Sequence, residues 1–266
     1  MASVAAPTGV SLNSTSTISV GKQNSIDLPV VPFEAFQATL GLQIALGTYG
    51  QIYEVRNMNP ARIYKIISSE KLNSGDEIRI AETAGKLQVA PQFYRAFSFQ
   101  FRETHQVVIE MEDGGKSLGK HMEEFAAKTA PPKPTSTSLT SSSLNSGGFI
   151  CISFAQQPPR ASIEDTVSDI YDKNPEAFYF QLFSRIKTLA EANISFRDTH
   201  VDNILPNSKK KNGLKLIDFD LATIESSVEA AKTKSLSLYT KVFLNDFRNL
   251  PNLSQESQNL IRWFES

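Results

Sequence analysis

The sequence is poor in cysteine, because Cys151 is the only one among 266 residues. One thiol excludes a disulfide within the chain, and it excludes a zinc site built from several cysteines. A reducing compartment is compatible with this composition. Any cation site is therefore expected to use other side chains.

The sequence also lacks a long apolar run and an excess of charge of either sign. No run approaches the roughly 20 apolar residues that a membrane-spanning helix needs, and residues 1–26 hold no apolar stretch of the signal-peptide kind. The net charge of -1 argues against nucleic acid as the main partner. With 40% hydrophobic and 21% charged residues, the chain can bury one sizeable core or two small lobes.

Two segments are low in complexity. Residues 1–30 are rich in Ser and Thr, and Asp27 is the first acidic residue. We expect a disordered tail there, which is either a plain terminus or an export and targeting signal. Residues 129–148 hold P-P-K-P, Ser/Thr runs and a glycine pair, which indicates a flexible insertion. The role of residues 149–172 stays open.

The most informative stretch runs from Asn193 to Ile224. It holds Asp198, then Asn203, and then Asp218 at the end of an apolar run. The pattern predicts a strand, a polar hairpin and a second strand over Leu214–Ile217. Such a hairpin can bring Asn203 and Asp218 to one Mg²⁺ ion, with Asp198 beside them, because Mg²⁺ prefers oxygen ligands. Each half of the pattern alone is also explained by an ordinary turn or cap.

Upstream, Phe33 to Val55 is predicted to form a strand, a turn and a strand. Glycines in the turn let backbone amides approach a phosphate, although a bare hairpin explains them equally well. Lys65 lies inside the apolar run R-I-Y-K-I-I, where it has to find a partner, hold a phosphate or reach solvent. The candidate nucleotide contacts of this region are Ala45, Gly47, Tyr49, Gly50, Ile52 and Lys65.

A helix is predicted over Ser74–Leu87, beginning with a capping box between Ser74 and Glu77. Glu77 and Glu82 are both candidates for an ion pair with Lys65. The capping role of Glu77 competes with that ion pair and leaves the choice open.

Two strands are predicted over Val89–Met111, joined by a charged turn at Arg102–His105. The apolar run at the end of the second strand leads into a polar segment that ends at Asp113. The candidate contacts to a nucleotide base are Ile109, Glu110 and Met111.

The strongest helix prediction begins after Asn174, with Pro175 at the first helical position. One face carries Phe178, Leu182, Ile186 and Leu189, which predicts a buried helix. Only 46 residues follow Asp220, and two or three helices are expected within Val228–Phe247 and Ser254–Phe264.

The candidate residues above occur in the order that is typical of the protein-kinase-like superfamily. The chain resembles that superfamily from about residue 33 to about residue 225. The resemblance implies an α+β, two-lobed kinase-like fold with a β-rich N-lobe over residues 31–112 and a reduced helical C-lobe over residues 113–266. It also implies ATP and Mg²⁺ as cofactors. The matching residues are Gly47, Gly50, Lys65, Glu77, the segment Ile109–Asp113, Asp198, Asn203 and Asp218.

The small kinases that pathogenic bacteria inject through type III secretion, the OspG/NleH type, show a more specific resemblance. They share a short C-lobe without an A-P-E segment, and an F-x-D-T-x-x-x-N loop that is matched by Phe196, Asp198, Thr199 and Asn203. The resemblance implies a secreted effector in the host cytoplasm that phosphorylates Ser or Thr of host proteins. It also implies ubiquitin or a ubiquitin-conjugating enzyme as an activating partner.

The roles that the resemblance implies are specific. Lys65, oriented by Glu77, holds the α- and β-phosphates; Asn203 and Asp218 hold Mg²⁺; and Asp198 accepts the proton of the substrate hydroxyl. Because the segment after Asp220 is short, activity is expected to be constitutive or controlled by a partner.

Several positions depart from the kinase pattern. Phe196 replaces a histidine, Asp220 replaces the glycine of D-F-G, and Ala45 replaces a loop glycine. A histidine at the position of His200, two residues after Asp198, is common in aminoglycoside and choline kinases and in haspin-like kinases. A histidine that only packs within the loop is an equally good interpretation. A small-molecule phosphotransferase and a pseudokinase that acts as a binding module therefore remain alternatives.

Overall fold

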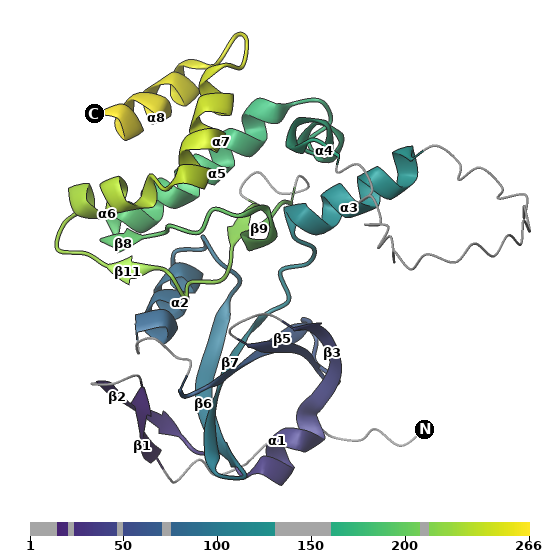
Figure 1. Cartoon of the computed structure of the whole chain (residues 1–266), viewed down its shortest axis with the longest axis vertical. Helices are drawn as coiled ribbons and strands as arrows, with labels where there is room; N and C mark the ends of the chain where they lie inside the picture. The colour runs from purple at the N-terminus through teal and green to yellow at the C-terminus, as the bar shows by residue number, and fades with distance from the viewer. Residues whose placement is uncertain (1–14, 21–23, 47–49, 71–75, 131–160, 208–212) are drawn as a thin grey trace, which may run out of the picture.

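The computed structural model describes residues 15–20, 24–46, 50–70, 76–130, 161–207 and 213–266. Within these ranges the chain has an α+β fold in which a five-stranded sheet lies at one end and the helices α4 to α8 lie at the other (Figure 1). Helix α2 (Asp76–Lys86) lies between the two ends. The α+β class predicted from the sequence is confirmed.

The sheet is antiparallel throughout, in the order β3-β4-β5-β7-β6. Its middle strands are apolar on both faces, because Val107 and Ile109 pack in a cluster with Ile78 of α2, whereas Val108 packs in another with Phe36. The predicted pair of strands before Met111 is therefore confirmed. The strands are β3 (Leu40–Leu46), β4 (Gln51–Val55), β5 (Arg62–Ser68), β6 (Phe93–Phe101) and β7 (Thr104–Glu112).

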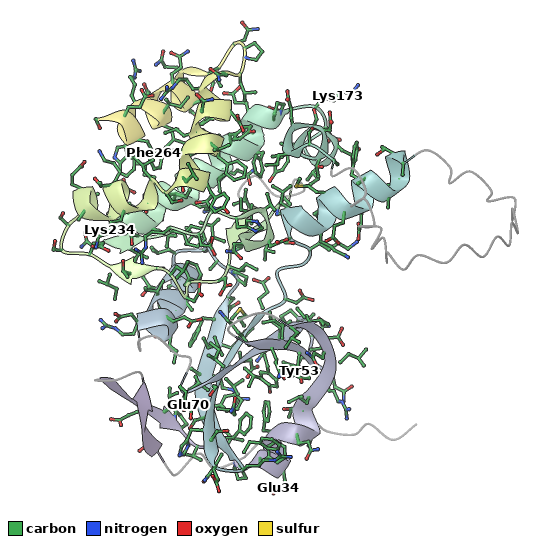
Figure 2. The ribbon with its side chains drawn as sticks, viewed as in Figure 1. Glu34, Tyr53, Glu70, Lys173, Lys234 and Phe264 are labelled. Carbon is green, nitrogen blue, oxygen red and sulfur yellow. The ribbon has the colours of Figure 1, made fainter. Side chains whose placement is uncertain are left out.

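Residues 33–39 form the helix α1 (Phe33–Thr39), not the strand that the sequence predicted. Its apolar positions Phe33 and Phe36 are three residues apart, which suits one face of a helix and not the alternation of a strand. Phe36 is buried and stacks on Phe99 of β6 with ring centroids 4.5 Å apart. Side chains fill the space between α1 and the sheet (Figure 2).

Two strands lie inside the segment that was expected to be disordered. The strands β1 (Thr15–Val20) and β2 (Asn24–Pro29) form an antiparallel pair, so the expectation of a tail without structure does not hold for these residues. Leu28 explains why, since it is 5% exposed and packs with Ile78 and Val107. The remaining residues of the expected tail, and most of the expected insertion over residues 129–148, lie outside the described residues.

Helix α5 (Pro175–Glu191) is the centre of the helical part, as predicted. The side chain of Asn174 caps it by accepting a hydrogen bond from the amide of Ala177, and all four predicted core residues of this helix are fully buried. Phe264 of α8 packs edge-on against Phe183 with centroids 5.1 Å apart (Figure 2). The other helices here are α3 (Leu118–Thr129), α4 (Ile163–Ile170), α6 (Val228–Ser235), α7 (Leu238–Arg248) and α8 (Gln255–Glu265).

Short strands hold the segment between α5 and α6. Strand β8 (Ile194–Ser195) pairs with β11 (Thr223–Ile224), and β9 (Ile204–Leu205) pairs with β10 (Lys215–Leu216). The second pair is the hairpin predicted from the sequence. A 3₁₀ turn, η1 (Val201–Asn203), precedes β9. Among the described helices, none is both long and apolar enough to cross a membrane.

Candidate active site

A cavity of about 850 Å³ opens between the sheet and the helical part. Its wall combines residues from β3, β4, β5, β7, α2 and the segment between α5 and α6. Segments that are far apart in the sequence therefore meet at one place. The predicted site residues that line it are Ala45, Gly50, Ile52, Lys65, Glu77, Ile109, Met111, Asp198, Asn203 and Asp218.

Lys65 is held between two carboxylates. Its Nζ lies 2.8 Å from Oε1 of Glu77 and 2.6 Å from Oδ1 of Asp218, and its side chain is only 12% exposed. Burial alone lowers the pKa of an ammonium, but Glu77 and Asp218 outweigh it and raise the pKa of Lys65 above its ordinary value. The lysine is therefore a fixed positive charge in the cavity wall.

Glu77 is the partner that the sequence left undecided. It lies on the buried face of α2 together with Ala81 and Ala84. Glu82 lies on the other side of the helix, where its Oε1 is 2.6 Å from Nζ of Lys86. Ser74 lies outside the described residues, so the proposed capping box stays a prediction.

Asp198 and Asn203 are joined by direct hydrogen bonds. The side-chain amide of Asn203 donates to Oδ2 of Asp198 at 2.8 Å and to its backbone oxygen at 3.1 Å. The backbone amide of Ile217 donates to the backbone oxygen of Asn203 at 3.0 Å, which fixes η1 against the strand before Asp218. Both side-chain bonds are donated by the amide nitrogen of Asn203. The amide oxygen, which is the atom suited to bind a cation, takes no part in them.

The chain turns sharply at Asp218, where φ is 63°. This left-handed conformation suits aspartate better than most residues. Phe219 then enters the core, where it packs edge-on against Phe196 with centroids 5.5 Å apart. The aromatic ring of Phe196 is thus a packing partner, 1% exposed.

Asp220 is the functional candidate that sequence reasoning missed. It lines the cavity, and its Oδ1 is buried without a hydrogen-bond partner among the described residues. Burial, together with the nearby carboxylate of Asp218, raises the pKa of Asp220 to about 6. The sequence did show a second aspartate, Asp220, two residues after Asp218. The burial of Asp220, however, depends on tertiary packing, which the sequence pattern does not show.

Glu110 does not line the cavity, in contrast to Ile109 and Met111. Its carboxylate is 1% exposed and binds Nη1 of Arg62 at 2.7 Å and Nε of Arg95 at 2.6 Å. The side chain therefore stabilises the sheet. Contact between its backbone and a base stays a prediction, and Gly47 and Tyr49 lie outside the described residues.

One part of the cavity wall is apolar and was not predicted in full. Branched side chains there carry no chemical signal in the sequence, because their position depends on the fold. Charged side chains also line the cavity, and among them Asp113 accepts a hydrogen bond from the amide of Gly115 at 2.9 Å. The lining residues without an earlier prediction include Ile44, Ile63, Phe93, Leu205, Ile217, Lys116, Lys120 and Asp202.

His200 lies beside the cavity and is not part of its wall. Its ring packs edge-on against Tyr239 with centroids 5.7 Å apart, and its Nδ1 lies 3.2 Å from Oδ2 of Asp202. The side chain also caps η1 by accepting from the amide of Asp202. These contacts support the interpretation of a packed loop histidine.

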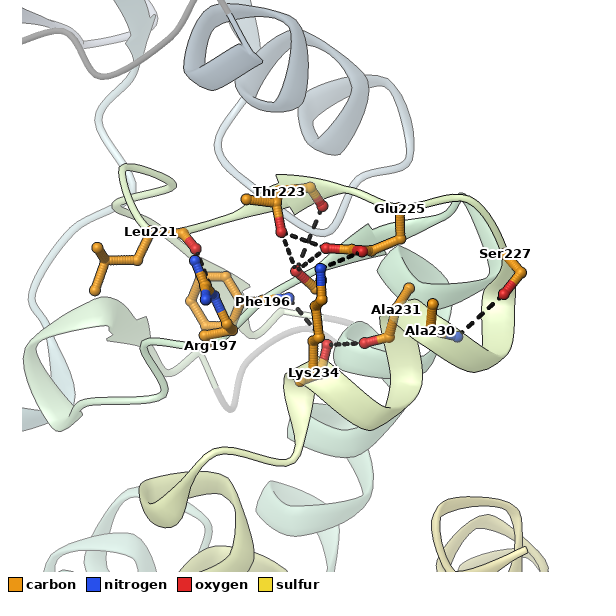
Figure 3. A network of polar contacts seen from close by, with 11 residues as sticks. Phe196, Arg197, Leu221, Thr223, Glu225, Ser227, Ala230, Ala231 and Lys234 are labelled. Atoms are coloured by element: carbon orange, nitrogen blue, oxygen red, sulfur yellow. Dashed lines mark hydrogen bonds and ion pairs between the residues drawn. The ribbon is translucent and has the colours of Figure 1, made fainter.

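The segment after Asp220 is fastened by polar contacts (Figure 3). Nε of Arg197 donates to the backbone oxygen of Leu221 at 3.0 Å. Glu225 accepts from Nζ of Lys234 at 2.6 Å, and its carboxylate also binds the hydroxyl of Thr223. Ser195 in β8 contacts the same hydroxyl at 2.8 Å. The loop that carries Asp198 and the segment that follows Asp220 are thus held together.

Comparison of the sequence with protein-family models gives no match, and a search of curated proteins gives none either.

Proposed function

We propose that this chain is a phosphotransferase with a two-lobed, protein-kinase-like fold, which transfers the γ-phosphoryl group of ATP to a Ser or Thr hydroxyl of a protein. The observation that carries the proposal is the contact of Lys65 with both Glu77 and Asp218 in one cavity wall. The bonded pair Asp198 and Asn203 lines the same cavity. These five side chains come from β5, α2, the loop that holds Asp198 and Asn203, and the turn at Asp218, and their order matches the kinase pattern.

The cavity has an apolar part and a charged part, and these suit the adenine ring and the phosphates of ATP. The adenine ring fits against apolar wall residues such as Ile52, Ile109 and Leu205. The ammonium of Lys65 faces the phosphates and offsets their negative charge. Glu77 keeps the lysine in place, since an ion pair with one helical partner fixes the long side chain.

The transfer step then needs little covalent chemistry from the protein. The substrate hydroxyl oxygen forms a bond to the γ-phosphorus while the bond from that phosphorus to the β,γ-bridging oxygen breaks. ADP leaves with the bridging oxygen, and the hydroxyl proton passes to the carboxylate of Asp198. Asn203 orients that carboxylate through its 2.8 Å hydrogen bond.

The residues at this site fit a Mg²⁺ ion bound together with the nucleotide. The amide oxygen of Asn203 and the carboxylate of Asp218 are hard oxygen donors, and phosphate oxygens complete such sites. Asp220 lines the same cavity, and its Oδ1, which has no hydrogen-bond partner among the described residues, is a further oxygen atom there. When bound, the ion neutralises charge on the phosphates.

Lys65→Ala and Asp218→Ala test the proposal. Each should lower phosphoryl transfer from radiolabelled ATP by about 10³-fold or more, because Lys65→Ala removes the ammonium that faces the phosphates and Asp218→Ala removes an oxygen ligand of Mg²⁺. Lys86→Ala is the matched control, since that lysine forms a surface ion pair with Glu82. Wild-type transfer by a variant that retains its thermal unfolding transition would refute the assignment.

A small-molecule phosphotransferase is the second candidate, and one observation favours it. Five aspartates line the cavity, and an acidic wall suits a cationic acceptor such as an aminoglycoside or choline. A panel of such acceptors, assayed beside host lysate proteins, separates the two functions. The five residues are Asp113, Asp198, Asp202, Asp218 and Asp220.

A further inference from the structure

Asp220 carries a carboxylate oxygen that the fold leaves without a partner. Its Oδ1 is buried and accepts no hydrogen bond from the described residues. A polar atom in this situation costs free energy unless something else binds it. Phe219 beside it is core, so packing of the neighbouring residue keeps the backbone of Asp220 where it is.

The surroundings of Asp220 hold more negative than positive charge. Asp220 lines the same cavity as Asp218, Glu77 and Lys65. Lys65 is the one ammonium in this set, and it is already in contact with the other two carboxylates. This set therefore holds three carboxylates and one ammonium, and a bound cation would offset the excess of negative charge.

We propose that Asp220 is a ligand of the divalent cation at this site, beside Asn203 and Asp218. The inference rests on the proposed function, because that function supplies the nucleotide. All three residues line one cavity and offer hard oxygen atoms. A glycine in the place of Asp220 offers no such oxygen, so this chain has one carboxylate more than the kinase pattern provides.

The same geometry makes the cation depend on the nucleotide. Among the described residues, no group of three or more His, Cys, Asp and Glu side chains is arranged as a metal site. The ligand set therefore needs the amide oxygen of Asn203 and oxygens from the phosphates. Cation uptake is expected to be weak without nucleotide and strong with it.

The experiment measures Mn²⁺ binding to the full chain by the loss of the electron paramagnetic resonance signal of free Mn²⁺, with and without ADP. Asp220→Asn keeps the shape of the side chain and removes the charge, and it should weaken ADP-dependent Mn²⁺ binding by about tenfold or more. Asp246→Asn is the control, because Asp246 is also a partly buried carboxylate but lies outside the cavity. Its Mn²⁺ binding should equal that of the wild type.

The possible results separate the inference from the function. If the wild type binds Mn²⁺ with ADP and Asp220→Asn binds it equally well, Asp220 is not a ligand and the proposed function stands. If the wild type takes up no Mn²⁺ with ADP, the proposed function fails as well. Should Asp220→Asn not fold, Asp220→Gly takes its place, and unchanged Mn²⁺ binding by that variant overturns the inference.

Discussion

Lys65 is a residue whose surroundings determine its chemistry. A buried ammonium without a partner would cost several kcal/mol, and the fold offsets this cost with two carboxylates instead of one. One of them, Asp218, is 36% exposed at the cavity surface. The other, Glu77, is 8% exposed and keeps the lysine in place.

Glu77→Gln should therefore lower phosphoryl transfer far more than Glu82→Gln does. Loss of the Glu77 charge lets the ammonium move toward Asp218, and a displacement of about 1 Å can cost about 10²-fold in rate. Glu82 pairs with the exposed Lys86, so its substitution should leave the rate unchanged. Steady-state rates of both variants at saturating ATP make the comparison. Equal rates would show that the ion pair does not position Lys65.

The sequence predicted the candidate site in part, and the limits have physical causes. The hairpin pattern predicted that Asp198, Asn203 and Asp218 meet, whereas the contact of Lys65 with this group was implied only by the resemblance to kinases. The choice between Glu77 and Glu82 depends on which face of α2 is buried. The burial of Oδ1 of Asp220 without a hydrogen-bond partner results from packing against distant segments, and no local sequence pattern predicts it.

The element that follows Asp220 connects the candidate site directly to α6. Glu225 is 7% exposed and accepts hydrogen bonds from Lys234 and Thr223, which lower the pKa of its carboxyl below the ordinary value (Figure 3). Phe196 next to the Asp198 loop donates its backbone amide to Ser235 of α6 at 3.0 Å. Contacts of α6 therefore help to set the position of Asp198.

Glu225→Gln should destabilise the chain at neutral pH but not at low pH. A carboxyl whose pKa is lower in the folded state stabilises that state above its unfolded pKa, and this contribution is lost as the pH falls through the folded pKa. We expect Tm to fall by about 2–4 °C at neutral pH, the shift that about 1 kcal/mol produces in a chain of this size.

Thermal unfolding followed by circular dichroism across pH checks this prediction. The difference in Tm between the wild type and Glu225→Gln should disappear well below pH of about 4. Glu256→Gln, which changes an exposed carboxylate of α8, serves as the control. A difference in Tm that persists at low pH would mean that the carboxylate charge is not what stabilises the segment.

Elements were predicted well where their periodicity is strong and poorly where a short segment is ambiguous. Helix α5 has apolar residues at helical spacing over its whole length, and its cap was visible in the sequence. Helix α1 has seven residues, and its neighbour β3 continues directly from it, so the two were taken as one strand. The pair β1 and β2 was missed because one buried residue, Leu28, anchors it.

At the scale of the whole molecule, helix α7 exposes a group of apolar side chains. Helix α8 packs on α5 and covers its core face. On α7, however, Leu238 is 77% exposed, Tyr239 is 52% exposed and Val242 is 51% exposed. Tyr239 contacts His200, two residues from Asp198, so this surface adjoins the candidate site. Clustered apolar side chains on a surface are typical of interaction sites.

If the proposed function holds, we predict that a partner protein, and not phosphorylation of a loop, controls the activity. In many kinases the arginine before the catalytic aspartate binds a phosphorylated loop, whereas Arg197 here already donates to the backbone of Leu221. The segment then enters α6 directly after Ser227. We therefore expect low basal transfer by the purified chain and no change in rate after phosphatase treatment.

Addition of a host lysate, of ubiquitin, or of a ubiquitin-conjugating enzyme should raise that rate, because a partner that binds the active arrangement more tightly shifts the population toward it. The increase in rate cannot exceed the ratio of the partner's affinities for the active and the inactive arrangement. A difference of about 1.4 kcal/mol between these two binding free energies allows an increase of at most about tenfold. Leu238→Lys with Val242→Lys should abolish the rise and leave the basal rate unchanged, because both side chains point to solvent in the free chain. Full activity of the purified chain, or loss of activity on dephosphorylation, would contradict control by a partner.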